Sequence, residues 1–152
     1  MEKKYGWLEK QKNMSLFNLF NKPEKTMQPP TYKVGQEWHY HTRPGEEEST
    51  VKITKIEYYT AVGCIIHIAI LNVNIQNPQH PNGLKDILHI PIAEAALRNS
   101  TTQLKDDRCE LPDYEFGFVH WKNLYDEEKA GYFDTSVDEI VNYLESGSFE
   151  KN

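Results

Sequence analysis

The chain has 152 residues, of which 38% are hydrophobic and 26% charged, and its net charge at pH 7 is −6. A chain of this length suits one domain that buries a core without disulfides or metal ions. Its apolar stretches are too short for a membrane-spanning helix, and none resembles a cleavable secretion signal. We therefore expect a soluble, cytoplasmic protein of bacterial type, in which Cys64 is a buried free thiol.

The charge is unevenly distributed along the chain. Residues 106–150 contain thirteen acidic and three basic residues, a balance of −10, whereas residues 1–105 carry +3. Phosphate binding requires clustered Lys and Arg, so the acidic C-terminal third disfavours nucleic acid as the main ligand. It is compatible with a basic protein partner, although solvated helix faces explain the same charge.

Residues 1–31 are predicted to be a flexible or loosely docked N-terminal arm and linker. This segment is polar and Lys-rich at its start, and Pro23 ends one potential helical turn. The two prolines within residues 28–31 make a stiff connection to the rest of the chain. Residues 32–152 are predicted to form a single domain.

Four stretches within residues 32–90 have the composition and alternation of β-strands. The second shifts its apolar frame midway, which indicates a bulge or a strong twist. The third is apolar on both faces and is therefore predicted to be a central strand that is covered on each side. These stretches are residues 37–42, 49–59, 64–75 and 84–90, and Pro91 is expected to end the last.

Two connections between these strands have clear turn chemistry. Pro44 and Gly45 suit the central positions of a type II turn, because Pro presets φ and Gly accepts a positive φ. Such a turn alone splays a two-residue hairpin, so we expect a longer loop that includes residues 46–48. Residues 77–83 contain two prolines and a glycine and are predicted to be a loop.

The C-terminal part is predicted to be mostly helical. Residues 92–99 form a short Ala-rich helix, and after the polar run at residues 100–108 a longer helix begins at residues 111–113 and ends at Gly131. A short strand at residues 132–135 precedes a capping box at residues 136–139, which starts a last helix that Gly147 stops. The inward-facing positions are Tyr114, Gly117, Phe118, Trp121, Leu124 and Tyr125 in the longer helix, and Val137, Ile140, Val141 and Leu144 in the last.

Strands that precede helices predict an α+β fold. We expect an antiparallel sheet of about four to five strands, strongly twisted or shaped as a half-barrel, with about two to three C-terminal helices packed on it. Most aromatic side chains, including Trp38, Tyr40, Tyr58 and Tyr59, are assigned to the core between sheet and helices.

Four histidines are candidates for chemistry. His39 and His41 lie at i and i+2, so both rings project from one strand face and could share a metal ion. No spacing in the sequence supplies the further ligands, so no metal site and no cofactor is predicted. His67 and His89 have apolar neighbours, so each is either held in a buried hydrogen-bond network or lines a pocket.

The segment around the Pro44-Gly45 turn gathers aromatic, guanidinium and carboxylate groups. If the third and fourth strands pair, His67 and His89 share a face, and together with the turn residues they would form a cleft suited to anion binding or proton transfer. The alternative, which we favour, is that the hairpin is architectural and does not face these histidines. The residues of the candidate binding cleft are Trp38, Tyr40, Arg43, Glu46, Glu47, His67 and His89.

Motifs of the common enzyme classes do not occur in the sequence. It contains no phosphate-binding Gly loop, no GxSxG nucleophile elbow and no HExxH zinc helix. Cys109 lies among acidic residues, which predicts a raised thiol pKa and a poor nucleophile. We therefore assign no catalytic residue and favour a function other than catalysis.

One stretch resembles known proteins. The string GQEWHYHTRPGEE at residues 35–47, with residues 111–115 and 129–131, resembles small bacterial proteins of uncharacterised function that share a GQxWxYxTRPGEE-like hairpin. The resemblance covers roughly residues 32–146. It implies no activity, so no functional residue is transferred from it.

Three functions are compatible with these patterns. The first is a small binding protein without catalytic motifs, for example an immunity- or inhibitor-type protein that recognises a basic protein partner. The alternative is a small enzyme or small-ligand binder that uses a His/Arg/Glu cleft on the sheet. A third is an oligomerising protein that uses residues 1–31 as an arm. The oligomeric state is left open.

Overall fold

The computed structural model of the chain describes residues 31–147, which contain seven strands and three helices. The predicted arm, residues 1–31, lies outside these described residues except for Thr31. In chain order the elements are β1 (Glu37–Tyr40), β2 (Thr50–Tyr59), β3 (Gly63–Leu71), β4 (Ile75–Asn77), β5 (His80–Leu84), β6 (Ile87–Ala93), α2 (Glu94–Ser100), β7 (Thr101–Asp106), α3 (Glu115–Asp126) and α4 (Val137–Ser146).

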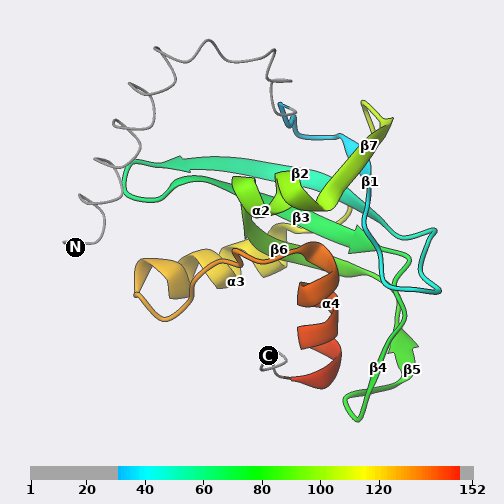
Figure 1. The fold of residues 1–152 in the computed structure, drawn as a ribbon. Coiled ribbons are helices and arrows are strands. Elements are labelled where there is room, and N and C mark those ends of the chain that lie inside the picture. The colour runs from blue at the N-terminus through cyan, green and yellow to red at the C-terminus, as the bar shows by residue number, and fades with distance from the viewer. Residues whose placement is uncertain (1–30, 148–152) are drawn as a thin grey trace, which may run out of the picture. The chain divides into compact units, whose positions relative to one another are not determined.

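Five strands form one antiparallel sheet in the order β6-β3-β2-β1-β7, and β4 pairs with β5 in a separate hairpin. The five-stranded sheet is twisted and open, and it does not close into a barrel (Figure 1). Two of the three helices follow all the strands, so the predicted α+β class is confirmed. None of the helices among residues 31–147 is long and apolar enough to cross a membrane.

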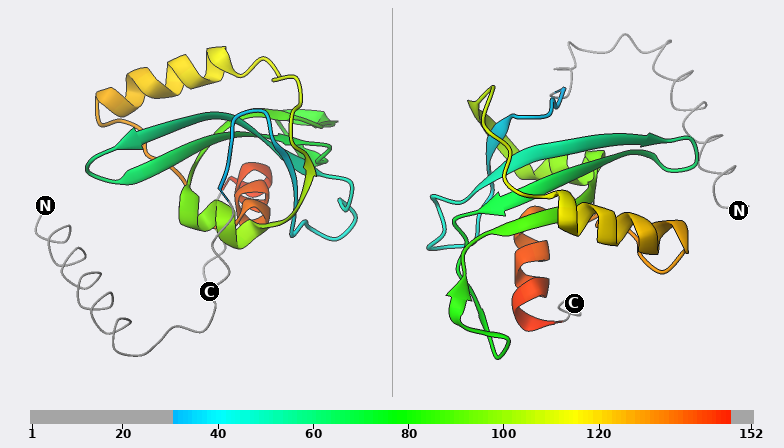
Figure 2. Two further views of the ribbon diagram at one scale, coloured as in Figure 1. Left: turned by 90° about the horizontal axis from the view of Figure 1, so that it is seen from above. Right: turned by 180° about the vertical axis from the view of Figure 1, so that it is seen from behind.

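Helices lie on both faces of this sheet. α3 covers one face, and α2 and α4 cover the other (Figure 2). The side chains of β3 alternate between the two layers, as the pleat requires. Ile66, Ile68 and Ile70 join the main core, which contains Ile140 of α4, whereas His67 contacts the aromatic rings of α3. The apolar character of β3 on both faces is therefore explained by its central, covered position.

The first hairpin has the predicted turn chemistry. Gly45 has a φ of 88°, and the Glu46 amide donates a hydrogen bond of 3.1 Å to the Arg43 carbonyl, as a type II turn requires. The loop extends to Ser49, whose amide donates to the Glu46 carbonyl at 2.8 Å. The bulge expected in the second strand is also present, as a register shift between Ile53 and Lys55 in the β2–β3 ladder.

The structure corrects the predicted end of the third strand and the predicted loop after it. β3 ends at Leu71, because Asn72 adopts a φ of 59° and breaks the ladder. The segment predicted as a loop is the β4–β5 hairpin. Its tight turn is closed by the Asn77 side chain, whose Oδ1 accepts hydrogen bonds of 3.0 Å from the amides of Gln79 and His80.

Pro91 does not end the fourth predicted strand, which continues as β6 to Ala93. β6 is an edge strand, and the backbone of Pro91 faces away from β3. Its carbonyl accepts a hydrogen bond of 2.9 Å from the Phe133 amide, and the Ala93 amide donates to the Phe133 carbonyl at 2.8 Å. The missing N–H of Pro91 therefore costs no ladder hydrogen bond. The strand expected at residues 132–135 is reduced to this bridge between Ile92 and Phe133.

The prediction also missed a strand, placed the end of one helix too late and expected a side-chain cap that is absent. β7 lies in the polar run and pairs with β1 at the sheet edge, where exposed polar side chains are tolerated. α3 ends at Asp126 rather than at Gly131, because Glu128 adopts the left-handed conformation with a φ of 61°. Ser136 stands at the N-cap of α4 but forms no side-chain cap. Gly147, with a φ of 78°, ends α4 as predicted.

Burial agrees with the predicted core at three aromatic positions, whereas Tyr59, Tyr114 and Phe118 are only partly buried. Trp38 and Tyr40 are buried, and Trp121 is the buried centre of α3. Val137, Ile140 and Val141 of α4 are fully buried. The prediction was wrong for Tyr58, which is 80% exposed near the end of the β2–β3 hairpin.

Gly117 allows α3 to approach β6 closely. A Cβ atom built on Gly117 would lie 2.9 Å from the Cβ of His89, which is closer than real Cβ atoms approach each other. Gly131, beyond the end of α3, would meet nothing within 4 Å. The absence of a side chain at residue 117 therefore sets the distance between α3 and the sheet.

We predict that Gly117→Ala lowers the free energy of unfolding by roughly 1–2 kcal/mol, because the overpacking against His89 exceeds the gain in helix propensity. Urea unfolding followed by circular dichroism measures this change. The matched control is Gly131→Ala, for which the change should stay within about 0.5 kcal/mol. A Gly117→Ala variant as stable as the control would contradict the close packing of α3 on β6.

Candidate functional site

A chain of three side chains crosses adjacent strands on the face covered by α3. The Nε2 atom of His67 on β3 lies 2.9 Å from Oε1 of Glu57 on β2. The Nδ1 atom of the same ring lies 2.9 Å from Nε2 of His89 on β6. The pairing of β3 with β6 places the two histidines on one face, with His67 opposite Pro91 in the ladder. We refer to Glu57, His67 and His89 as the histidine chain.

Aromatic rings of α3 enclose the histidine chain. Phe118 and Trp121 meet the His67 ring edge to face, each with a centroid distance of 4.9 Å. His67 is fully buried, whereas the Glu57 side chain is 19% exposed. Glu57 Oε1 also accepts a hydrogen bond of 3.0 Å from the Tyr59 hydroxyl. Both ring nitrogens of His67 are therefore satisfied in an otherwise apolar layer.

This environment keeps both histidines neutral near pH 7. Burial lowers the pKa of His67, although the hydrogen bond to Glu57 acts in the opposite direction. Burial, followed by the neighbouring His67, lowers the pKa of His89 to about 4. Desolvation outweighs the single carboxylate because the charged imidazolium loses its hydration under α3.

Neutral rings and one carboxylate together fix the direction of every hydrogen bond in the chain. The Glu57 carboxylate can only accept, so the proton of His67 must reside on Nε2. The Nδ1 atom of His67 then carries a lone pair and must accept from Nε2–H of His89. Nδ1 of His89 is therefore unprotonated, and it makes no hydrogen bond to any of the described residues.

His89 also lines a groove of about 530 Å³ between β6 and the start of α3. The groove is open to solvent, and its lining combines apolar groups with two carboxylates. Gly117 forms part of the wall next to the His89 ring. The lining residues are Leu84, Asp86, Ile87, Leu88, His89, Asp113, Phe116 and Gly117.

The predicted cleft residues do not form a single site. Arg43 binds Glu46 through two hydrogen bonds of 2.6 and 2.9 Å, and its Nη1 contacts Glu145 of α4 at 3.0 Å. These hydrogen bonds raise the pKa of Arg43 and lower that of Glu46. The Glu46 carboxylate also accepts from the Asn74 amide at 2.6 Å. This hairpin is bonded to α4 and to the loop before β4, and none of these hydrogen bonds involves His67 or His89.

Three further predicted site residues have structural partners of their own. Trp38 donates from Nε1 to Gln36 at 3.1 Å, and the Tyr40 hydroxyl lies 2.6 Å from Ser49 Oγ. Burial raises the pKa of Tyr40 to about 12. Glu47 is exposed and accepts a hydrogen bond from the Gly45 amide at 3.0 Å. Of the seven predicted cleft residues, the hydrogen bonds join His67 with His89 and Arg43 with Glu46.

The remaining candidate ligands and nucleophiles lie elsewhere. His39 is half-buried and His41 is exposed on β1 and the residue after it. Within residues 31–147, no group of three or more His, Cys, Asp or Glu side chains could hold a metal ion. Burial, together with Asp106 and Glu37, raises the pKa of Cys109 to about 11, in the predicted direction. At neutral pH this thiol is protonated and a poor nucleophile.

Sequence reasoning missed Glu57 and Phe116. Glu57 lies in the half of β2 after the bulge, so its face depended on a register that only the assembled sheet reveals. Phe116 was outside the predicted inward stripe of the helix, which left its role undefined. An apolar residue on the outer face of an otherwise amphipathic helix was the available signal.

Comparisons with known proteins do not place this chain in a protein family. No protein-family model matches it, and neither does any curated protein or solved structure. A proposal for function therefore rests on the geometry of the side chains of this protein.

The histidine chain predicts a loss of stability in mild acid. Unfolded histidine has a pKa near 6.5, and the folded His89 titrates at about 4, so the unfolded state binds more protons between these values. The free energy of unfolding should therefore fall as the pH is lowered from 6.5, by about 1 kcal/mol at pH 5 after allowance for partial solvent screening. Urea unfolding at a series of pH values measures this slope. The charged side chains that shift the pKa values of the two rings are Glu57, Lys55 and Lys122.

Between pH 6.5 and 5, the change in stability caused by His89 can be measured apart from the change caused by Glu46. Glu46 has a lowered pKa, so its contribution is lost only below its ordinary value of 4.5. The control is the same pH series on His89→Gln, in which the slope between pH 6.5 and 5 should become shallower. An identical slope in the variant would show that His89 is not the group responsible.

Proposed function

We propose that the chain is a small binding protein that recognises a basic protein partner through the outer face of α3, as an immunity- or inhibitor-type protein would. The observation that carries this proposal is the exposure of Phe116, a residue that is 85% accessible. A phenylalanine is seldom left so exposed, and surface aromatic residues are a common centre of protein–protein interfaces.

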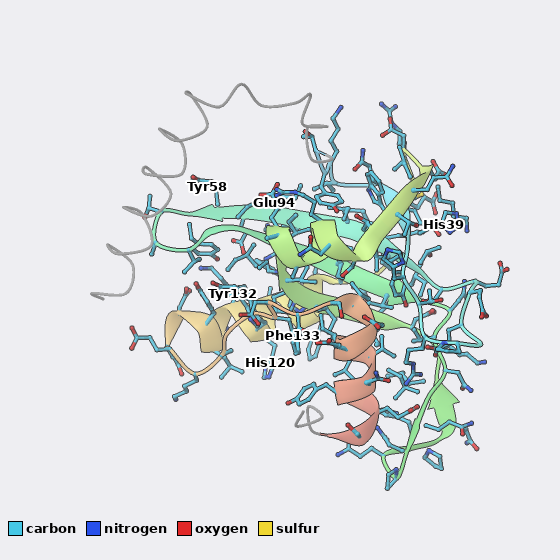
Figure 3. The ribbon with its side chains drawn as sticks, in the orientation of Figure 1. His39, Tyr58, Glu94, His120, Tyr132 and Phe133 are labelled. Atoms are coloured by element: carbon cyan, nitrogen blue, oxygen red, sulfur yellow. The ribbon has the colours of Figure 1, made fainter. Side chains whose placement is uncertain are left out.

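The exposed apolar residues near Phe116 form one surface. Val119 is 53% exposed and lies one helical turn after Phe116. Leu88 on β6 is 41% exposed and lines the same groove as Phe116. His120, next to Val119, projects from α3 on the side away from the sheet (Figure 3). We call Leu88, Phe116 and Val119 the α3 apolar surface.

The packing of α3 on the sheet explains why Phe116 faces the solvent. Phe116 and Phe118 are separated by roughly 200° around the helix axis, so only one of them can face the sheet. Phe118 and Trp121 take the inner side, where they pack on the His67 ring. A rotation that buried Phe116 would expose these two rings, so the apolar outer face does not result from loose packing of the helix.

The charges around the α3 apolar surface favour a basic partner. Asp86 and Asp113 line the groove beside Phe116, and Glu115 is the exposed first residue of α3. The nearest basic residue on the helix, Lys122, is bound to Asp126 at 2.7 Å. An apolar centre with an acidic rim matches a partner surface that presents Lys and Arg around apolar side chains.

The alternative of a small enzyme with a His/Arg/Glu cleft has less geometric support. Arg43 is neutralised by Glu46 and Glu145, and His67 is fully buried. Of the groups in that hypothesis, His89 alone lines the open groove beside α3. An anionic substrate would also meet two carboxylates there, which opposes its binding.

We predict that Phe116→Ala weakens binding of the partner. The full chain, immobilised and exposed to a lysate, should retain a basic protein, which mass spectrometry identifies and which is then purified. Binding of that protein, measured by calorimetry, should weaken steeply with salt and by roughly tenfold or more in the variant, because a central aromatic contact is lost.

The matched control is Tyr58→Ala. Tyr58 is 80% exposed on β2, so its removal tests whether any exposed aromatic group has the same effect. It should bind the partner as the wild type does. A partner whose affinity is insensitive to both Phe116→Ala and salt, or one with an acidic surface, would contradict the proposed function.

A further inference from the structure

We propose that mild acid releases α3 from the sheet: protonation of the histidine chain opens residues 111–132 as a unit while the rest of the fold stays in place. The opening carries Phe116 and Val119 away from Leu88 and so divides the α3 apolar surface. The opening is a property of the chain alone, whereas its consequence for binding rests on the proposed function.

Residues 111–132 are attached to the rest of the protein at their two ends. Before them, the Cys109 amide donates a hydrogen bond of 2.7 Å to the Gly35 carbonyl. After them, the Phe133 amide donates to the Pro91 carbonyl at 2.9 Å. Among the described residues, the backbone hydrogen bonds of residues 111–132 join only members of this segment. The segment can therefore leave the sheet without breaking a backbone hydrogen bond to it.

Side chains hold α3 on the sheet, and their contacts centre on the two imidazoles. None of the described residues of α3 belongs to the main hydrophobic core, which lies on the other face of the sheet (Figure 2). Phe118 and Trp121 pack on the His67 ring, each with a centroid distance of 4.9 Å. The same two rings lie 6.0 and 5.9 Å from the His89 ring. The closed position of α3 therefore depends on the state of His67 and His89.

A second proton on either ring is incompatible with this packing. On His67 it would occupy Nδ1, so that two N–H groups would face each other across the 2.9 Å to Nε2 of His89. On His89 it would create a cation that the His67 ring separates from the carboxylate of Glu57. Opening of α3 returns water to both rings, so the charged forms are favoured in the open state.

The charges around the two rings do not stabilise a second proton in the closed state. The carboxylate of the histidine chain favours the charged form of both rings, but burial has the larger effect. Two lysines oppose that carboxylate at His67. Two aspartates beside His89 are exposed, so water weakens their effect. The charged groups that face the rings are Glu57 and Lys55 on β2, Lys122 on α3, and Asp86 and Asp113 at the groove.

The direction of the pH dependence follows from proton binding. Burial lowers the pKa of both rings in the closed state, that of His89 to about 4, whereas a hydrated imidazole titrates near 6.5. The open state therefore binds more protons as the pH falls below 6.5, and the ratio of open to closed molecules rises. For His89 this rise is on the order of tenfold between pH 7 and pH 5.

Hydrogen exchange of the full chain, without a partner, tests the opening directly. Amide exchange rates are measured at pH 7 and pH 5, and each is divided by the intrinsic rate at that pH. The amides of α3 should exchange faster than those of β3 at both pH values, because they require only the local opening. The opening constant of α3 should rise on the order of tenfold from pH 7 to pH 5.

Two variants identify the group that controls the opening. His89→Gln removes a titrating ring and keeps an amide that can donate to His67, so the rise in the opening constant should become several-fold smaller. The matched control is His120→Gln, because His120 is exposed and projects from the same helix away from the sheet (Figure 3). It should show the full rise. The exchange of β3 amides at pH 7 reports whether each variant is folded.

Three results would overturn the acid release of α3. These are amides of α3 that exchange as slowly as those of β3, an opening constant that does not change between pH 7 and pH 5, and a full rise in His89→Gln. The partner's apparent affinity should fall in proportion to the closed fraction. If a basic partner binds through Phe116 while α3 opening is independent of pH, the acid release is wrong and the proposed function stands. If α3 opens in acid but no basic partner exists, the proposed function alone fails.

Discussion

The hydrogen-bonded chain from Glu57 through His67 to His89 determines how α3 and the sheet fit together. His67 lies on a central strand between isoleucines and is fully buried. A buried imidazole nitrogen without a partner costs about 1–3 kcal/mol, so the fold must supply an acceptor on one side and a donor on the other. Glu57 on β2 and His89 on β6 meet that requirement from the two strands that flank β3.

The position of α3 follows from this chain. The helix covers the two imidazoles with Phe118 and Trp121, and Gly117 lets it approach the His89 side chain without a clash. Because these rings use the inner face, Phe116 is left outside. His89, at one end of the histidine chain, also lines the groove beside Phe116, and Glu57, at the other end, is partly exposed.

Much of the fold could be predicted from the sequence, because its signals are local. The Pro44-Gly45 turn, the bulge in β2, the central position of β3 and the Gly147 helix stop all follow from residue chemistry within a few positions. The failures depended on tertiary context. Pro91 is tolerated because its strand lies at the sheet edge, and β7 exists because β1 offers it an edge to pair with.

The candidate site was less accessible to sequence reasoning. The sequence indicated that His67 and His89 would share a face if the third and fourth predicted strands paired, and these strands do pair, as β3 and β6. Glu57 could not be assigned, since the bulge between Ile53 and Lys55 moves the second half of β2 by one residue. Arg43 was grouped with the histidines because of its chemistry, but Glu46 and Glu145 bind it in a different part of the structure.

The direction of the hydrogen bonds in the histidine chain is the central claim, and the tautomers of the two rings report it directly. Long-range ¹H–¹⁵N correlation spectra of the full chain at neutral pH distinguish a protonated ring nitrogen from a bare one. Both His67 and His89 are expected to carry their proton on Nε2, and Nδ1 of His89 is expected to be unprotonated. A proton on Nδ1 of His89, or a doubly protonated His67, would contradict the account.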